Sequence, residues 1–86
     1  MTWRVVIHRS VRKFERRHPE YKGVITKVVS ELAENPYIGT RLKGRCSWLW
    51  KLRKGNLRII YEIRASSKTV YIWRVGFREN IYEEIC

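Results

Sequence analysis

The chain has 86 residues, of which 19 are Lys or Arg and 8 are Asp or Glu, so its formal net charge is +11. This length fits a single domain, 1–86, and so strong a positive charge predicts a partner that is nucleic acid, an anionic membrane surface or an acidic protein. No apolar run approaches the ~20 residues of a membrane-spanning helix, and the opening residues MTWRVVIH lack the apolar region of a signal peptide. We therefore expect a cytoplasmic protein that does not enter a membrane.

The first two predicted elements are a strand over 2–8 and a short helix over 11–18. Apolar and polar residues alternate in the strand. Ser10 is a candidate N-cap for the helix, because its hydroxyl can accept from a backbone amide of the first turn. Pro19 cannot continue that helix, but it can stand in the first turn of the next one.

The second helix, predicted over 20–34, has the clearest pattern in the chain. Apolar residues recur at helical spacing on one face, and Asn35-Pro36 ends the helix. The residues on that face are Tyr21, Val24, Ile25, Val28, Val29 and Leu32. A loop with several basic residues, 37–46, follows.

Residues 48–77 predict three consecutive strands. A two-residue turn at Lys54-Gly55 would place Lys51 opposite Arg58 and Leu52 opposite Leu57. One face of the first two strands is then entirely apolar, with Trp48, Trp50, Leu52, Leu57, Ile59, Tyr61 and Ile63. The other face carries Lys51, Arg53, Asn56 and Arg58. Because like charges that face each other across a sheet repel, this basic face predicts an anionic ligand.

The last strand extends both faces. Its alternation predicts Tyr71, Trp73 and Val75 on the apolar face, and it predicts Arg74, Gly76 and Arg78 on the basic face. The whole pattern predicts an α+β fold in the order β-α-α-β-β-β. A mostly antiparallel four-stranded sheet would carry two N-terminal helices on one face, and a short C-terminal tail would follow it, in which 79–85 form a short helix. In this fold the apolar face, with Trp50, Leu52, Ile59 and Tyr61, would meet Val24, Ile25, Val28 and Leu32.

The side-chain inventory excludes several kinds of site. His8, His18, Cys46 and Cys86 match no metal-ligand spacing, and we expect the cysteines to be free thiols. The sequence has no Gly-rich phosphate loop and no pair of carboxylates set for acid–base chemistry, so any catalysis must come from Lys, Arg and Tyr. The basic face, interrupted only by Glu62, is then either the solvated surface of a basic protein or a site for the phosphates of RNA or DNA.

Three strings together resemble the RelE/ParE superfamily of toxins. RLKGRCSWLWKLRKGNLRIIYEI, residues 41–63, looks like the central hairpin of the superfamily, and VGFRENIY, residues 75–82, looks like its C-terminal V-G-H-R-x-x-V-Y segment. ENPYIGTRLKG, residues 34–44, resembles the approach from the long helix to that hairpin. The likeness covers nearly the whole chain, and the order and spacing of the strings are more specific than any one of them.

The resemblance implies the toxin of a type II toxin–antitoxin system, neutralised by an acidic antitoxin. In the RelE branch it implies a cofactor-free endoribonuclease that cuts mRNA in the ribosomal A site by attack of a ribose 2′-hydroxyl on the adjacent phosphate. By position, Lys51, Arg58, Arg78 and Tyr82 match catalytic residues of that branch. Arg53 matches a phosphate-binding residue, and we expect Lys43, Lys54 and Arg74 to contact RNA as well.

Two departures leave alternatives open. Leu49 stands where some members have a second lysine, and Phe77 stands where many have histidine, so the general base is not identified. Lys51 and Tyr82 are candidates for that role, and Lys43 or Lys54 could replace them. A non-enzymatic inhibitor that binds DNA gyrase, as ParE-type relatives do, is the alternative function. An inactive relative that only binds an antitoxin or nucleic acid is a further one.

Overall fold

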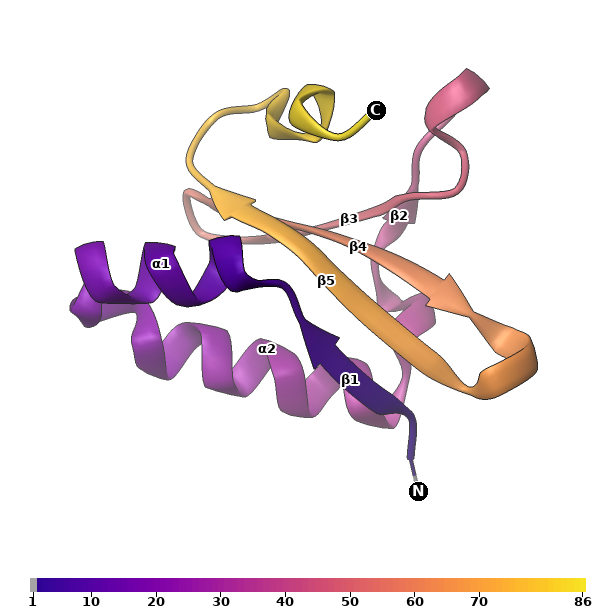
Figure 1. Cartoon of the computed structure of the whole chain (residues 1–86), viewed down its shortest axis with the longest axis horizontal. Helices are drawn as coiled ribbons and strands as arrows, with labels where there is room; N and C mark the ends of the chain where they lie inside the picture. The colour runs from indigo at the N-terminus through magenta and orange to yellow at the C-terminus, as the bar shows by residue number, and fades with distance from the viewer. Residues whose placement is uncertain (1) are drawn as a thin grey trace.

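The computed structural model describes residues 2–86 and shows a twisted sheet with two helices on one face (Figure 1). Its elements are β1 Arg4–Ile7, α1 Arg9–Arg17, α2 Lys22–Glu34, β2 Thr40–Arg41, β3 Trp50–Lys54, β4 Leu57–Arg64 and β5 Thr69–Gly76. The predicted α+β class and the order of the main elements are confirmed. The sheet has five strands instead of four, because the two-residue β2 forms within the predicted loop and pairs with β3.

The strand order in the sheet is β1-β5-β4-β3-β2. β1 runs parallel to β5, whereas the three other neighbouring pairs are antiparallel. The first strand of the chain therefore lies beside the last one. The antiparallel hairpins β3–β4 and β4–β5 form the centre of the sheet, which is the part that positions the candidate site.

The start of α1 differs from the prediction. His8, not Ser10, is the N-cap, and its Nδ1 accepts from the Ser10 amide at 3.1 Å. The Ser10 hydroxyl instead donates to the Trp73 carbonyl of β5 at 2.8 Å, which fixes the start of the helix to the sheet. Pro19 ends α1 as predicted and opens a single turn of 3₁₀ helix, Pro19–Tyr21, so that α2 begins at Lys22.

The helix-side core lies between the two helices and the sheet. Trp50 and Leu52 are half-buried against this core, as predicted. Val24 was expected in it but is 36% exposed, because the buried stripe of α2 runs through Ile25, Val28 and Leu32 instead. The buried members of the helix-side core are Val11, Ile25, Val28, Leu32, Leu57, Ile59, Tyr61, Val70, Ile72 and Val75.

The β3–β4 hairpin turns one residue later than predicted. Its turn is Gly55-Asn56, and Gly55 has a φ of +60°, a value that glycine adopts without strain. Arg53 consequently lies opposite Arg58. The partner of each residue has shifted by two positions, which leaves both faces as predicted because side chains alternate with a period of two. Trp48 is an exception, being 43% exposed, since β3 begins only at Trp50.

An irregularity in the β4–β5 pairing corrects the predicted faces of β5. Ile60 pairs with Arg74 but Tyr61 pairs with Ile72, so Trp73 is an extra residue that reverses the alternation. Tyr71, which lies before this bulge, and Trp73 both lie outside the helix-side core, contrary to prediction. Val75 and Arg74 lie on the predicted faces because they come after the bulge.

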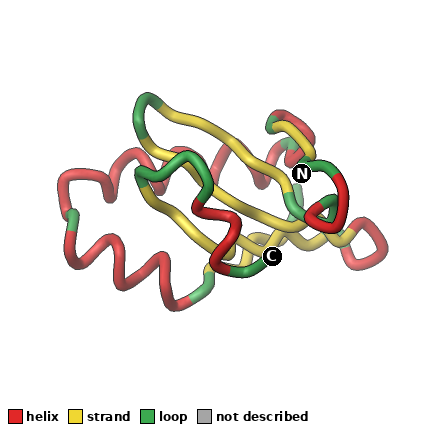
Figure 2. The backbone as a smooth tube through the Cα atoms, turned by 90° about the horizontal axis from the view of Figure 1, so that it is seen from above, coloured by secondary structure: helices red, strands yellow, loops and turns green. Residues whose placement is uncertain are grey.

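The last ten residues, 77–86, form what we call the closing segment, which crosses the face of the sheet opposite the helices (Figures 1 and 2). Residues Ile81–Glu84 form the short helix predicted there, as a 3₁₀ turn. Ile81 lies directly on β5, where a Cβ on Gly76 would overlap it. With Leu49 and Ile60, Ile81 makes a small tail-side core, against which Leu42, Trp73, Tyr82 and Ile85 pack.

The prediction of two free thiols is wrong. Cys46, at the end of the 3₁₀ turn Gly44–Cys46, forms a disulfide with Cys86, and their Cα atoms are 5.7 Å apart. The cysteines are separated by 40 residues in sequence, so only the folding of the closing segment over the sheet brings them together. The disulfide joins the end of that segment to the connection between β2 and β3.

Candidate active site

Four cations predicted on the basic face gather around two carboxylates of the closing segment. Glu79 forms ion pairs with Arg58 and, at 3.9 Å, with the Nζ of Lys51. Glu84 bridges the Nε of Arg74 at 3.1 Å and the Nη2 of Arg78 at 2.8 Å. Lys51 comes from β3, Arg58 from β4, Arg74 from β5 and Arg78 from the closing segment, and we call these four residues the cation cluster.

Arg58 is the most enclosed member of the cation cluster, with a side chain that is only 11% exposed. Its Nη1 donates to the carbonyls of Asn56 and Phe77, each at 3.1 Å, and its Nη2 donates to Glu79. Arg58 also lies opposite Gly76 in the sheet. These contacts fix the plane of the guanidinium, so its Nη1 and Nη2 donors are held in one orientation.

Arg74 links the cation cluster to α1. Its Nη1 donates to the Trp73 carbonyl at 2.8 Å, to the Ser10 hydroxyl at 3.3 Å and to Nδ1 of His8 at 3.4 Å. Burial lowers the pKa of His8, and the charges of Arg74 and Arg9 lower it further. The neutral imidazole is therefore the form that accepts at the start of the helix.

Tyr82 is half-buried and packs against the tail-side core. Its carbonyl accepts from the amides of Ile85 and Cys86 at 3.1 and 3.0 Å. The closing segment thus positions both Tyr82 and Arg78, and any movement of the segment would move both residues.

The predicted RNA-contacting residues do not all lie together. Arg53 is exposed opposite Arg58, with its Nε donating to the Gly55 carbonyl at 2.9 Å, and Lys43 is exposed in the connection between β2 and β3. Lys54 instead faces α2, where its Nζ lies 3.0 Å from Glu31. Because side chains alternate along β3, Lys54 lies on the same face as Trp50 and Leu52, and the sequence pattern could have predicted that it faces the helices.

Two further cations, Lys13 and Arg17, were not predicted in the site. With Arg74 and Glu84 they line a hollow of about 260 Å³ between α1 and the closing segment. Among residues 2–86, neither forms an ion pair with a carboxylate. Their spacing of four residues places both on one side of a helix, and this pattern in the sequence could have predicted that they lie together.

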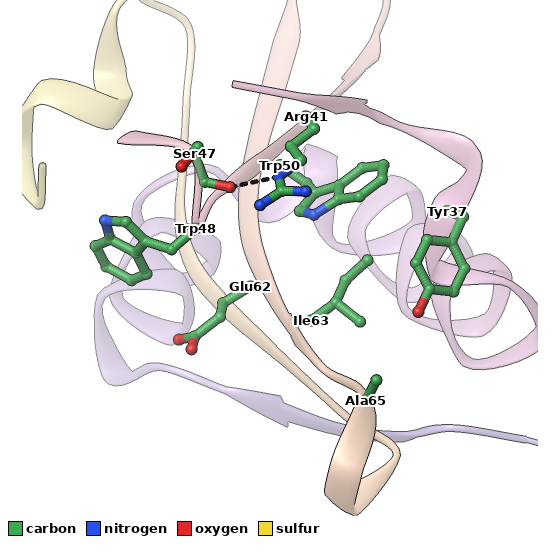
Figure 3. A pocket seen from close by; sticks show the side chains of 8 residues that line it. All are labelled: Tyr37, Arg41, Ser47, Trp48, Trp50, Glu62, Ile63 and Ala65. Atoms are coloured by element: carbon green, nitrogen blue, oxygen red, sulfur yellow. Dashed lines mark hydrogen bonds between the residues drawn. The ribbon is translucent and has the colours of Figure 1, made fainter. Parts of the chain in front are cut away.

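A second hollow, of about 330 Å³, lies at the end of β4, away from the predicted catalytic residues (Figure 3). Its charged side chains already have partners, because Arg41 donates to the Ser47 carbonyl at 2.7 Å and Glu62 accepts from Arg64 and Trp73. It offers aromatic surface but no cluster of free donors. The residues that line it are Tyr37, Arg41, Ser47, Trp48, Trp50, Glu62, Ile63 and Ala65.

Two other kinds of site are missing from the part of the chain that the structure describes. Within residues 2–86, no three His, Cys, Asp or Glu side chains gather so that they could hold a metal ion. Over the same residues, neither helix combines the length and the apolar character needed to cross a bilayer.

A family model matches residues 5–86 of the sequence, and it describes the ParE-like toxins of type II bacterial toxin–antitoxin systems. The match covers nearly the whole chain, so the chain belongs to this family, within the RelE/ParE superfamily that its motifs resemble. Among curated proteins, no sequence matches significantly.

Solved structures of RelE toxins share the fold. The toxin–antitoxin complex RelBE2 from Mycobacterium tuberculosis contains a chain that matches with a TM-score of 0.80 and 22% identity, over 91% of this chain and 93% of that one. A mutant of E. coli RelE in the free state matches with a TM-score of 0.73 and 20% identity over 100% of both chains. A chain of the archaeal RelE–RelB complex from Pyrococcus horikoshii matches with a TM-score of 0.70 and 22% identity, over 92% of this chain and 98% of that one.

Proposed function

We propose that this chain is an endoribonuclease toxin that cuts mRNA in the ribosomal A site. The observation that carries the proposal is the convergence of the cation cluster, which comes from three strands and the closing segment. A transition state that gathers negative charge on phosphorus is stabilised by fixed positive donors, and Arg58 is already held in one orientation.

In the proposed reaction, Arg58 and Arg78 bind the oxygens of the scissile phosphate. A guanidinium presents a planar fork of donors and stays charged at any working pH. Lys51 or Tyr82 removes the proton of the 2′-hydroxyl, whose oxygen forms a bond to phosphorus. The bond from phosphorus to the 5′-oxygen breaks, and that oxygen takes up a proton. The products are a 2′,3′-cyclic phosphate and a 5′-hydroxyl.

The wider RNA-contacting surface would include Arg53 and Arg74, which lie on the same face of the sheet as Arg58, and Lys43, which is exposed in the connection between β2 and β3. Lys54 has no part in this proposal, because it pairs with Glu31 on the helix side. Lys13 and Arg17 would extend the positive surface along α1. Contacts of this kind position a nucleic acid without reading its sequence.

We also propose that an acidic antitoxin is the protein partner. The net charge of +11 favours such a partner, and two of the similar structures are complexes of RelE-type toxins with antitoxins. Association steered by charge slows as salt rises, because exposed charges are screened over ~8 Å at physiological ionic strength.

The alternative function is a non-enzymatic inhibitor of DNA gyrase, since the matching family model is named after ParE-like toxins. The cation cluster favours the nuclease because a protein that only binds gyrase has no need of fixed donors for a phosphate. An inactive relative that binds only antitoxin or nucleic acid would retain the charge but would cut nothing.

Primer extension on a translated message with purified protein tests the proposal, and specific breaks are expected. Arg58→Ala and Arg78→Ala should each slow single-turnover cleavage by a factor on the order of 10²–10³, as loss of one oxyanion donor does. Arg58→Lys should rescue only part of this loss, because a point charge cannot bind two oxygens at once.

The matched control is Arg16→Ala, which removes an equal charge from the exposed face of α1 and should cut normally. A thermal melt of each variant checks the fold. If Arg58→Ala and Arg78→Ala remain folded and cut at the normal rate, the active site is elsewhere. Intact message together with double-strand breaks in a gyrase reaction would select the alternative.

A further inference from the structure

The hollow of about 260 Å³ between α1 and the closing segment, which we call the α1 hollow, has the features of a binding site. One side of α1 lines it with residues spaced three and four apart, which fall on one stripe of a helix. A water molecule takes up only ~30 Å³ of the liquid, so the α1 hollow has room for a ring system. The residues of this stripe are Ser10, Lys13, Phe14, Arg17 and His18.

Lys13 and Arg17 are the cations of the α1 hollow that are available to a ligand. Both are exposed, and within residues 2–86 neither forms an ion pair with a carboxylate. Arg74 also lines the hollow, but its Nε already donates to Glu84 at 3.1 Å and its Nη1 to the Ser10 hydroxyl at 3.3 Å. A phosphate can therefore bind Lys13 and Arg17 without displacing a carboxylate, and the closing segment stays in place.

Aromatic rings lie beside these two cations. The rings of Phe14 and His18 have centroids 4.6 Å apart, and Phe77 packs against both rings at 5.4 and 5.3 Å. The side chain of His18 is 37% exposed and Phe77 is 38% exposed, so part of this aromatic surface is open to solvent. Nucleobases stack on such rings whatever their identity, because every base has a π-face.

The aromatic surface is connected to the guanidinium that is proposed to bind the scissile phosphate. The Nη1 of Arg58 donates to the Phe77 carbonyl at 3.1 Å, and Arg58 pairs with Gly76 in the sheet. Arg74 precedes Gly76 by two positions, and such diagonal neighbours in a sheet lie ~7–8 Å apart. A single strand of RNA bound at Arg58 therefore passes close to the α1 hollow.

We propose that the α1 hollow binds one nucleotide of the RNA beside the cleavage position, with its phosphate on Lys13 and Arg17 and its base against Phe14 and His18. The inference rests on the proposed function, because it takes the RNA at Arg58 as the substrate. Stacking contacts position the strand without selecting a base. The closing segment forms the opposite wall through Ile81 and Glu84, so the subsite needs this segment where the structure has it.

The test of the phosphate contact measures binding of a short single-stranded RNA that is 2′-O-methylated throughout and so cannot be cleaved. Fluorescence anisotropy over a series of salt concentrations gives the affinity and its dependence on salt. Each neutralised phosphate of a single strand contributes about 0.7 to the slope of log affinity against log salt. Lys13→Gln/Arg17→Gln should lower that slope by about 0.7 and weaken binding roughly fourfold at about 0.15 M salt.

A matched pair of substitutions separates the subsite from net charge. Arg16→Gln/Lys27→Gln also removes one Arg and one Lys from exposed positions, but neither residue lines the α1 hollow. This control should change the slope and the affinity much less. A thermal melt of each variant checks the fold.

A single abasic nucleotide, moved along the same RNA, tests the base contact. At one position the loss of the base should weaken binding about tenfold, as removal of one base–aromatic stack does. His18→Leu should weaken binding of the intact RNA and reduce the penalty for the missing base at that position. His18→Phe keeps a ring there and should behave like the wild type.

Either of two results overturns the subsite. One is equal slopes and affinities for Lys13→Gln/Arg17→Gln and its control pair, and the other is the absence of any position where the effect of base removal depends on His18. Arg58→Ala makes this failure distinct from failure of the proposed function. If Arg58→Ala binds the RNA more weakly than the wild type while either result is obtained, only the subsite fails. If Arg58→Ala and the wild type bind equally, the cation cluster is not the RNA surface, and both proposals fail.

Discussion

The two faces of the sheet are built in different ways. On the helix side, ten buried residues from α1, α2, β4 and β5 form one apolar core. On the opposite side, three buried residues lie beside two ion-paired glutamates and a disulfide. The helix side stabilises the fold by burying apolar surface. The opposite side buries much less apolar surface and instead holds charged side chains in position. The fold is thus maintained on one face, and the charged groups are arranged on the other.

The largest expected effect on stability comes from a truncation in the helix-side core. Ile59→Ala should lower the free energy of unfolding by about 2–5 kcal/mol, because Ile59 is 1% exposed and its loss leaves a cavity. Ile81→Ala is the matched truncation in the tail-side core, and it should cost less because the closing segment can leave the sheet locally. Urea unfolding followed by circular dichroism measures both. Equal losses would show that the two faces are one cooperative unit.

A smaller effect comes from a buried hydroxyl. Tyr61 donates to the Pro36 carbonyl at 2.7 Å and accepts from the Gly39 amide at 3.1 Å, at a position with 0% exposure. Tyr61→Phe leaves both backbone groups without this partner and should cost about 1–3 kcal/mol in urea unfolding. A loss no larger than that of an exposed Tyr37→Phe control would contradict this role.

Tyr61 also makes the free energy of unfolding depend on pH. Burial raises the pKa of Tyr61 to about 12, whereas an unfolded tyrosine titrates near 10. The unfolded chain therefore loses this proton first, and the free energy of unfolding should fall as pH rises from about 10 to about 12. Tyr61→Phe removes this component and leaves the titration of the other groups. Parallel slopes for wild type and variant over that range would contradict the assignment.

The smallest effect compares two glycines. Gly76→Ala should push Ile81 off β5, and limited proteolysis should then cut the closing segment more readily. Gly23→Ala, in α2 with open space around it, should instead stabilise the protein by about 0.5–1 kcal/mol. A thermal melt and a proteolysis time course of both variants are the measurement. Unchanged proteolysis of Gly76→Ala would show that Ile81 does not seat the segment.

Local patterns were enough to predict most of the fold. The spacing of Ile25, Val28 and Leu32 predicted α2, and the alternation in β3 and β4 predicted both faces. The turn was misplaced because Lys54-Gly55 and Gly55-Asn56 are both acceptable two-residue turns, and only the paired strands choose between them. The bulge at Trp73 leaves no trace in a pattern of alternating residues.

The candidate site was less predictable. Its cations come from positions that alternation and family resemblance could identify, and the structure brings Lys51, Arg58, Arg74 and Arg78 together. The two glutamates that pair with these cations belong to the closing segment, and no local sequence pattern determines where that segment lies on the sheet. The Cys46–Cys86 disulfide was missed for the same reason, because two cysteines 40 residues apart give no signal until the chain has folded.

The parallel pairing of β1 with β5 has a consequence for how the protein is made. Arg4 pairs with Thr69, so contacts at this edge join positions near opposite ends of the chain. Contacts so distant in sequence form slowly, because a long loop must close before they contribute any stability. During synthesis β1 is made long before β5 exists, and the sheet cannot be completed until β5 has been made. A chain that needs this sheet to act would therefore stay inactive until its last strand has been made.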